Sequence, residues 1–542
     1  MVFSLILGFA RNGDACLGDC MKLERKALID FKGGLKDPEN RLSSWRGANC
    51  CHWRGITCDN QTGAVIAIDL HNPLVSIELQ VNDLYGRIPL GFKLPANFEN
   101  MTSLYHLDLS HSRVEGGILS SIGAEDCGFN SSLPRLRFLK LSHNQFGGKL
   151  PEWLPRLHNL EALHLRNNLF QGPIPASLGT LARLSKLDLG WNRLNGTLPD
   201  SLGQLSELEH LDLSSNDLMG MITEVHLSKL SKLNLVMLET LDLGNNNLTG
   251  RIPLWFVDSF SFLRILCLRL NRFFGELPSQ LSKLRSLQVL DLAENEFNGS
   301  IPATFGKLKA MSQENKRNHY LYYGFGGFKG SSFYQESFVV NIKGNSIKYS
   351  RTLSLVIGID LSGNNLHGQF PEEITQLVGL VVLNLSRNHI SSQIPVNISR
   401  LHQLSSLDIS NNSFSGPIPS SMSCLDSLGY LNLSYNNLSG RIPYIGHMTT
   451  FDVPTFFRNP GLYGDPLLEC PAPPEINGDH SGNASSSTDK WLYLSIELGF
   501  IAGILVPYIA FAIRRPWWSA YMGYVETVVD RLSYWGYKLV VR

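Results

Sequence analysis

The stretch that decides the fold is residues 184–199, LSKLDLGWNRLNGTLP. Leu184, Leu187 and Leu189 precede Asn192, and a Gly and a Pro follow four and seven residues after that Asn. The same frame recurs along the chain, mostly at intervals of 24 residues, and in two weaker early copies Pro73 and Ser112 stand at the Asn position. The chain is therefore predicted to consist of about thirteen internal repeats. The Asn positions are 144, 168, 192, 216, 246, 271, 295, 364, 388, 412 and 436.

This frame is that of a leucine-rich repeat, and its spacing has a physical cause. Leucines two apart on a short strand point to the same side, so they enter a core while the residues between them face solvent. The Asn amide is expected to satisfy backbone groups that the following turn leaves unpaired. We expect an α/β solenoid with about nine repeats in residues 64–306 and four in residues 351–446, stabilised by the stacking of neighbours and covered at both ends.

Composition limits the function. The 542-residue chain has 47 basic and 47 acidic side chains, so no positive surplus is available for binding nucleic acid. Leucine accounts for 87 residues, which reflects the repeat frame. No HExxH, GxSxG, P-loop or kinase motif occurs in the sequence. We therefore expect no enzymatic activity, no cofactor and no metal.

The leucine frame is interrupted once, in residues 307–350. The segment 301–350 contains only two leucines, and residues 315–350 are rich in Tyr, Phe and Gly. One interpretation is a disordered spacer. The other, which we favour because aromatic side chains are enriched at recognition surfaces, is an ordered island packed over the concave face. Tyr322, Tyr323 and Tyr334 are its candidate ligand contacts.

Residues 11–63 are predicted to cap the first repeat. Leu23, Ala27, Phe31 and Leu35 recur at a helical interval of four, and Trp45, the Cys50-Cys51 pair, Trp53 and Cys58 follow. Metal binding is the competing explanation of clustered cysteines, but a second CxxC or a His pair is missing. An amphipathic helix followed by a disulfide-linked loop is the better interpretation.

Several features indicate the secretory pathway. Residues 1–10 resemble the apolar part of a signal peptide, although no basic residue precedes that apolar part. Many of the sequons arise from the repeat's own NLS and NLT strings, so they support this placement only together with the cap and the span described below. The twelve sequon asparagines are Asn60, Asn100, Asn130, Asn195, Asn247, Asn298, Asn384, Asn397, Asn411, Asn432, Asn437 and Asn483.

The C-terminal part predicts a single membrane crossing. Residues 447–490 form a second cap and an acidic juxtamembrane segment, and residues 491–513 are an apolar run long enough for a transmembrane helix. The tail, residues 514–542, has five basic and two acidic side chains, which places the repeats outside the cell. Ser495, Gly499 and Gly503 form a small-xxx-small stripe that favours association with another membrane helix.

Several segments together resemble the plant leucine-rich-repeat receptor-like proteins. They are ERKAL at residues 24–28, the CC-x-W pattern at 50–53, the island end VVNIKGNSIKYSRTLSLVIGIDLS, the four terminal repeats and the span that begins with Lys-Trp. The island boundary and the run GRIPYIGHMTTFDVPTFFRNPGLYGDPLLEC are most similar to the group of receptors for fungal ethylene-inducing xylanase. This resemblance implies a right-handed, plant-type superhelix at the plasma membrane that perceives an extracellular elicitor.

The resemblance also implies partner kinases and two disulfide bonds. A SOBIR-type adaptor kinase would pair through the membrane helix at Gly499 and Gly503, and a SERK-type co-receptor kinase would bind the repeats in residues 351–446. The segment Tyr537 to Val540 fits a YxxΦ endocytic signal. By resemblance, the expected disulfides are Cys20–Cys50 and Cys51–Cys58, which leaves Cys16, Cys127, Cys267, Cys424 and Cys470 unassigned.

The chain departs from this family in two respects. It has fewer repeats than family members usually have, and Tyr463 stands where the C-terminal cap normally has a cysteine. Two alternatives to an immune receptor therefore stay open: a developmental peptide co-receptor, and a decoy that binds without signalling. On the concave side, most residues between the last two leucines are Asp or Asn. Residues that break this pattern or lie beside it are candidate ligand contacts, namely Lys140, His164, Arg166, Trp191 and Arg269.

Overall fold

The computed structural model describes part of the chain, which divides into two units, Met1–Cys470 and Pro471–Arg542. All described residues lie in the first unit. The second unit, with the predicted membrane span 491–513 and tail 514–542, lies outside them. The described residues are 20–33, 37, 40–70, 86–87, 101–111, 114–116, 133–152, 154–227, 238–254, 256–257, 260–313, 338–342, 345–349 and 357–467.

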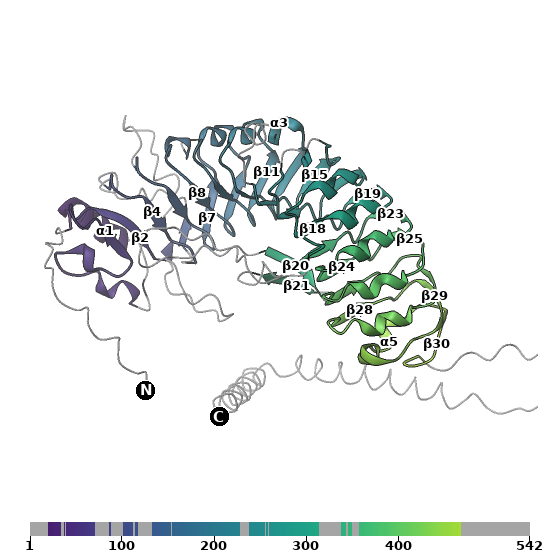
Figure 1. Ribbon diagram of the computed structural model, residues 1–542. Helices are drawn as coiled ribbons and strands as arrows, with labels where there is room; N and C mark the ends of the chain where they lie inside the picture. The colour runs from purple at the N-terminus through teal and green to yellow at the C-terminus, as the bar shows by residue number, and fades with distance from the viewer. Residues whose placement is uncertain are drawn as a thin grey trace, which may run out of the picture. The chain divides into compact units, whose positions relative to one another are not determined.

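A 14-stranded sheet runs through the described repeats, and apart from β1, which pairs antiparallel with β2, its strands are parallel (Figure 1). The repeat leucines explain it, because Leu187, Leu211 and Leu241 pair in register on successive strands and are buried. The strands are β1 (Ile56–Cys58), β2 (Val65–Asp69), β4 (His106–Asp108), β6 (Phe138–Lys140), β8 (Ala162–His164), β10 (Lys186–Asp188), β12 (His210–Asp212), β14 (Thr240–Asp242), β16 (Ile265–Cys267), β18 (Val289–Asp291), β22 (Gly358–Asp360), β24 (Val382–Asn384), β26 (Ser406–Asp408) and β28 (Tyr430–Asn432).

After eleven of these strands, from β2 to β24, the chain turns and adds a strand to a second parallel sheet, which has eleven strands among the described residues. The residue before each repeat Asn adopts a positive φ, as at Trp191 with φ 56°. The second sheet consists of β3 (Gly86–Arg87), β5 (Val114–Gly116), β7 (Gln145–Lys149), β9 (Leu169–Gly172), β11 (Arg193–Thr197), β13 (Asp217–Met221), β15 (Asn247–Gly250), β17 (Arg272–Glu276), β19 (Glu296–Gly299), β23 (Asn365–Gly368) and β25 (His389–Ile390).

The repeat Asn holds this turn, as its chemistry predicts. Asn192 donates from Nδ2 to the carbonyl oxygens of Leu165 and Leu189, both at 3.0 Å, and its Oδ1 accepts the amide of Phe170 at 3.1 Å. Leu165 and Phe170 belong to the preceding repeat, so each Asn joins two repeats. We call this series of asparagines the Asn ladder.

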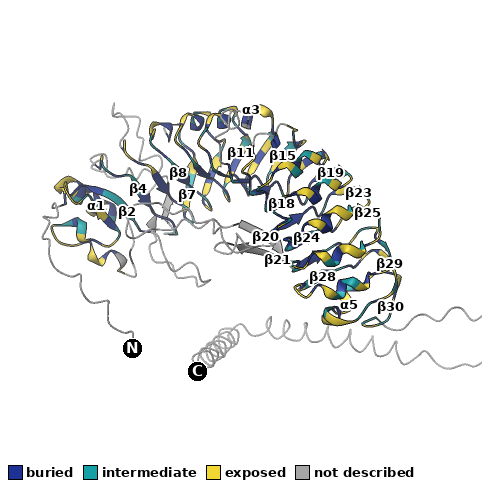
Figure 2. Ribbon diagram, viewed as in Figure 1, coloured by how far each residue is buried: buried dark blue, intermediate teal, exposed yellow. Residues whose placement is uncertain are grey.

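Short 3₁₀ helices cover the side opposite the large sheet. Several begin directly after the repeat Pro, as η5 (Ala176–Thr180) does after Pro175 and η6 (Asp200–Gln204) after Pro199, and each buries a leucine, Leu178 or Leu202. The leucines between the two sides form one continuous core, and Figure 2 shows the strands of the large sheet as buried. Further turns of this kind are η4 (Leu154–Arg156), η8 (Ser279–Lys283), η9 (Ala303–Lys307), η11 (Glu372–Gln376), η12 (Val396–Arg400), η13 (Ser420–Cys424) and the C-terminal η14 (Gly446–Thr450), and the four-residue α-helix α3 (Glu224–Leu227) takes the same place.

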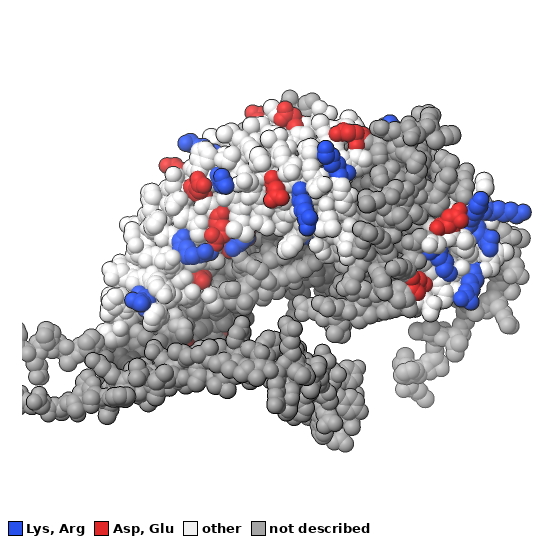
Figure 3. Space-filling model, turned by 180° about the vertical axis from the view of Figure 1, so that it is seen from behind, with Lys and Arg blue, Asp and Glu red and all other residues white. Residues whose placement is uncertain are grey.

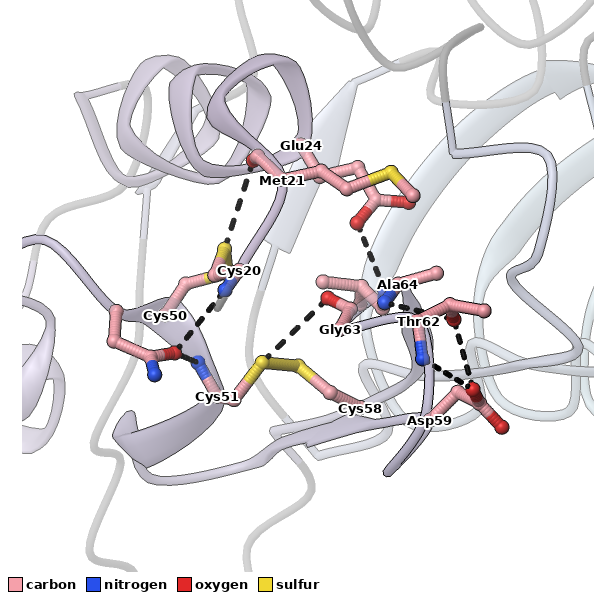
Figure 4. The surroundings of a disulfide bond; sticks show 12 residues. Cys20, Met21, Glu24, Cys50, Cys51, Cys58, Asp59, Thr62, Gly63 and Ala64 are labelled. Atoms are coloured by element: carbon pink, nitrogen blue, oxygen red, sulfur yellow. Dashed lines mark hydrogen bonds between the residues drawn. A yellow bond between two sulfur atoms is a disulfide. The ribbon is translucent and has the colours of Figure 1, made fainter. Parts of the chain in front are cut away.

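The N-terminal cap confirms the expected disulfides. Cys20 is bonded to Cys50 and Cys51 to Cys58, with Cα–Cα distances of 5.3 and 5.5 Å. The sulfurs lie beside the start of helix α1 (Lys22–Gly33) and the 3₁₀ helix η2 (Cys50–His52) (Figure 4). The rings of Trp45 and Trp53 stack 5.4 Å apart beneath the loop that includes η1 (Arg41–Ser44).

The buried face of α1 differs from the predicted one. Leu23 is exposed, and the buried residues are Glu24, Ala27, Leu28 and Phe31, which follow the i, i+3, i+4, i+7 spacing of one helix face. Glu24 is buried because its carboxylate accepts the Val65 amide of β2 at 2.8 Å (Figure 4). Burial raises the pKa of Glu24, and this hydrogen bond opposes the rise.

The repeats continue across the inserted segment, which we define as residues 312–356. Strand β18 pairs directly with β22, and Leu308 and Met311 are buried in the core, so the preceding repeat extends beyond residue 307. Within the insertion, β20 (Phe338–Ile342) and β21 (Asn345–Tyr349) form an antiparallel hairpin. The candidate contacts Tyr322, Tyr323 and Tyr334 lie outside the described residues.

The last repeats end in a three-stranded sheet of β27 (Ser415–Gly416), β29 (Asn437–Arg441) and β30 (Gly461–Tyr463), and the short helix α5 (Val453–Phe456) lies between β29 and β30 in the chain. Tyr463 lies in β30 opposite Arg441 and is 37% exposed. Within the described part of the chain, no helix combines the length and apolar character that a bilayer crossing requires. On the face drawn in Figure 3, charged side chains of both signs are interspersed.

Candidate functional site

The candidate site is the outer face of the large sheet, where the first and third residues of each strand lie side by side with their counterparts on neighbouring strands. We call the third residues the third-position row. From Asp108 to Asp360 its members are buried, and only the last three are partly exposed. In strand order the row consists of Asp108, Lys140, His164, Asp188, Asp212, Asp242, Cys267, Asp291, Asp360, Asn384, Asp408 and Asn432.

This burial corrects the expectation that residues between the repeat leucines face solvent. Lys140 and His164 are only 5% and 1% exposed, and His210 in the neighbouring first-position row is 6% exposed. Neighbouring strands in a sheet lie about 4.8 Å apart, so side chains on one face cover one another. The sequence shows which residues share a face of the sheet, but not how deeply their side chains bury one another.

Asp recurs in the row because it caps the turn after its own strand. Oδ1 of Asp212 accepts the amide of Ser214 at 2.9 Å and the Ser214 hydroxyl at 2.6 Å, and Asp360 binds Ser362 in the same way. The second oxygen of each carboxylate is left to face the row. The row therefore concentrates negative charge for a local structural reason.

Near the N-terminal end of the row, Lys140 offsets part of this charge, and His164 lies beside a second aspartate. The Lys140 amine lies 3.6 Å from Asp108, and the His164 ring nitrogen Nδ1 lies 3.9 Å from Asp188. Burial lowers the pKa of His164 to about 4, so the ring is neutral at physiological pH. Both predicted contacts are therefore buried partners of aspartates.

Arg166 bridges two members of the row. Its guanidinium forms an ion pair with Asp212, and Nη1 lies 3.8 Å from Asp188. Burial opposes ionisation of Asp188, but the adjacent His164 ring and the charge of Arg166 outweigh burial and lower the Asp188 pKa to about 2. The Arg166 guanidinium also lies 6.0 Å from the ring centre of Trp191, which is 48% exposed. Two of the predicted contacts thus form one partly exposed group.

Arg269 repeats this arrangement further along the row. Its Nη1 lies 3.0 Å from Asp360 and 3.5 Å from Asp291. Burial and the neighbouring Asp360 nevertheless raise the pKa of Asp291 to about 7. Burial and Asp212 likewise raise the pKa of Asp242 to about 7. Two arginines therefore leave part of the negative charge of the row uncompensated.

The positive-φ residues before the repeat asparagines form a second line of side chains along the sheet edge. Sequence analysis identified only Trp191 among them. The rings of His111 and His143 stack 4.1 Å apart, and His143 Nδ1 lies 2.9 Å from Asn167 Nδ2. At the other end, Tyr435 packs edge-on to Phe457 at 5.9 Å. The other residues of this line could have been identified from the sequence, because each stands directly before a repeat Asn.

Side chains that could bind a metal ion lie close together at one place along the row. Among the described residues, Asp188, His210 and Asp212 offer three donor atoms within 4.8 Å of one another, and the other such group consists of disulfide cysteines. The ion pair of Arg166 with Asp212 already neutralises this position. At this position of the row, Arg166 compensates the charge of Asp188 and Asp212.

Other predicted sites lie outside the described residues. They are Asn100, Asn130, Asn483, the membrane stripe Ser495, Gly499 and Gly503, and the endocytic signal Tyr537 to Val540.

The fold and its repeats define the class of this chain. Residues 21–59 match the leucine rich repeat N-terminal domain, and residues 158–218 match the leucine rich repeat. Single leucine rich repeats match residues 135–157, 237–258, 286–308, 379–401, 403–425 and 427–447. The chain is thus a leucine-rich-repeat protein with an N-terminal cap domain.

Its relatives include plant receptor-like proteins, as the sequence resemblance implied. The chain is 37% identical over 133 residues to receptor-like protein EIX2 of Solanum lycopersicum and 34% identical over 158 residues to receptor-like protein EIX1 of the same plant. These alignments cover 24% and 28% of this chain but only 12% and 14% of the two relatives.

A solved structure agrees with this fold. The plant peptide hormone receptor RGFR1, in complex with RGF2, superimposes with a TM-score of 0.50 and 26% sequence identity. The superposition covers 70% of this chain and 53% of the receptor.

Proposed function

We propose that this chain is a non-catalytic cell-surface receptor-like protein that binds an extracellular protein or peptide elicitor and signals in plant defence through partner kinases. The observation that carries the proposal is the uninterrupted large sheet, whose edge presents the Arg166–Trp191 group. A rigid sheet holding a partly exposed aromatic beside an arginine has the composition of a protein-recognition surface. The similarity to EIX1 and EIX2 supports this class of function.

Two kinds of partner belong to the proposal. A SOBIR-type adaptor kinase would associate through Ser495, Gly499 and Gly503 in a membrane helix, because small residues let two helices approach closely. A SERK-type co-receptor kinase would bind the repeats in residues 351–446. Tyr435 and Phe457 support that location, because they are 52% and 45% exposed and form one aromatic pair.

The adaptor is tested by co-precipitation from plant cells that express the full chain. Replacing Gly499 and Gly503 together by Leu should abolish recovery of the adaptor kinase. The control is Ala512→Leu, which adds bulk to the same predicted helix on the face away from the stripe. Equal recovery from all three chains would contradict association through the stripe.

Ligand recognition is tested by an elicitor-triggered cell-death assay in the same cells. Trp191→Ala should abolish the response to a fungal xylanase without changing the amount of chain at the surface. The exposed Leu254→Ala, outside the candidate site, is the control and should respond normally. A response that Trp191→Ala leaves intact would exclude this residue as a contact.

Peptide perception in development is the second candidate. The chain is 34% identical over 115 residues to phytosulfokine receptor 1 of Arabidopsis thaliana, an alignment that covers 19% of this chain and 11% of that receptor. A growth response to a secreted peptide, with none to xylanase, would favour this candidate. Surface expression with neither response would favour a decoy.

A further inference from the structure

The sequons of the described repeats fall on different faces of the solenoid. Asn195, Asn247 and Asn298 lie in β11, β15 and β19 of the second sheet, and Asn437 lies in the adjoining strand β29. All four are exposed. By contrast, Asn384 and Asn432 end strands β24 and β28 and belong to the third-position row, where they are partly buried.

The two sequons in the row have a structural explanation. Asn384 Oδ1 accepts the amide of Ser386 at 3.1 Å and its hydroxyl at 2.8 Å, and Asn384 Nδ2 donates to the Ser362 hydroxyl at 3.2 Å. Asn432 binds Ser434 in the same way and donates to Asp408 at 3.2 Å. The sequon Asn and Ser are thus the two halves of the turn cap that Asp and Ser form elsewhere in the row.

The second-sheet sequons have no such role. Among the described residues, the side chains of Asn195, Asn247, Asn298 and Asn437 make no hydrogen bond. N-glycosylation attaches a bulky, solvated oligosaccharide at Nδ2. An exposed side chain can carry it without loss, whereas at Asn384 it would compete with a hydrogen bond and with neighbouring side chains of the row.

Apolar side chains beside these sequons are consistent with a covering glycan. Met219 and Met221 point to one side of β13 and are 48% and 57% exposed. In the sheet register Met219 lies directly between Thr197 and Asn247, and Asn195 lies opposite Asp217 of the same strand. Two sequons therefore flank the exposed methionines.

We propose that the second sheet is the glycan-bearing face of the chain, modified at Asn195, Asn247 and Asn298 and continued at Asn437, while Asn384 and Asn432 stay unmodified. This inference rests on the extracellular placement in the proposed function. It assigns the third-position row, with Asn384 and Asn432 unmodified, to the protein ligand and the second sheet to carbohydrate that shields Met219 and Met221.

The full chain expressed in a mammalian secretory host tests this map. Peptide N-glycosidase converts each glycosylated Asn to Asp, so mass spectrometry should find the conversion at Asn195, Asn247, Asn298 and Asn437 and not at Asn384 or Asn432. On a gel, Asn247→Gln should remove the mass of one glycan, whereas Asn384→Asp should leave mobility unchanged. Asp already occupies the Asn384 position in most repeats, so this variant is expected to fold.

A second readout tests the shielding. Peroxide should oxidise Met219 faster in Asn247→Gln than in the unaltered chain, while the rate at Met21 in the cap, 46% exposed, should be the same in both. Conversion at Asn384 or Asn432 to the same extent as at Asn247 would overturn the map, as would equal Met219 rates. A chain without any glycan would contradict both this map and the extracellular placement. Surface biotinylation would then show whether the chain reaches the cell surface.

Discussion

At the scale of single residues, the repeat Asn carries more of the fold than its place in a turn suggests. Asn192 donates to three carbonyl groups and accepts one amide, and two of these four partners belong to the preceding repeat. Each buried backbone group that loses its hydrogen-bond partner lowers the free energy of unfolding by about 1–3 kcal/mol. The Asn192 side chain therefore contributes several kcal/mol to the stability of the fold.

We expect Asn192→Ala to destabilise the solenoid by about 2–4 kcal/mol, because these backbone groups stay buried without their partner. Thermal unfolding would show the loss as a lower midpoint. Arg193→Ala is the control, since that exposed side chain lies next to Asn192 at the start of β11 and should change stability by less than about 0.5 kcal/mol. Similar midpoints for the two variants would refute the importance of the ladder.

Much at this scale was predictable from the residues. The recurrence of Asn predicted its backbone role, and the family resemblance implied the Cys20–Cys50 and Cys51–Cys58 disulfides. The burial of Lys140 and His164 was not predictable, because it depends on the lateral packing of strands that lie 24 or more residues apart in sequence.

At the scale of elements, the third-position row behaves as one electrostatic unit. Asp242 and Asp291 have pKa values raised to about 7 in the folded chain, whereas an aspartate in an unfolded chain titrates near pH 4. The folded chain therefore binds more protons than the unfolded chain between about pH 4 and pH 7. The stability that these protons contribute is fully present below pH 4 and is lost as the pH rises through 7.

We expect the melting temperature to fall between pH 5 and pH 7 and Asp242→Asn to reduce that fall. Asn occupies the same position in two other repeats, at 384 and 432, so the turn cap is retained. Asp217→Asn removes the same charge from an exposed position on β13 and should leave the pH profile unchanged. Parallel profiles for all three chains would show that Asp242 does not titrate in this range.

Close packing between the 3₁₀ helices gives a second prediction at this scale. A Cβ added at Gly306 of η9 would collide with the backbone carbonyl of Glu373 in η11. Gly306→Ala should therefore lower the melting temperature, because backbone atoms cannot move aside as a flexible side chain can. Gly33→Ala, where a Cβ would meet no atom within 4 Å, serves as the control. No difference between them would show that the two helices can separate freely.

At the scale of the whole molecule, the inserted segment is an addition to an otherwise continuous solenoid. Phe297 donates its amide to Asn364 at 3.0 Å across 67 residues of sequence, just as Leu194 donates to Asn216 across 22. The leucine count predicted that something was inserted. It did not predict that the strands on either side of the insertion pair directly, because that depends on the fit of β18 against β22.

Removing residues 312–356 should leave a folded solenoid. The Asn positions 295 and 364 are 69 residues apart, and deleting 45 residues restores the regular interval of 24. We expect the deleted chain to keep its circular dichroism spectrum and its resistance to trypsin while losing the elicitor response. Loss of both spectrum and resistance would show that the insertion supports the repeats.

The Asn ladder has a consequence for the history of such chains. Each asparagine forms hydrogen bonds only within its own repeat and with the repeat before it. These hydrogen bonds therefore do not depend on the number of repeats in the chain. Recombination can therefore excise or duplicate whole units and leave a junction identical to any other. A short chain of this kind can descend from a longer one without passing through an unfolded ancestor.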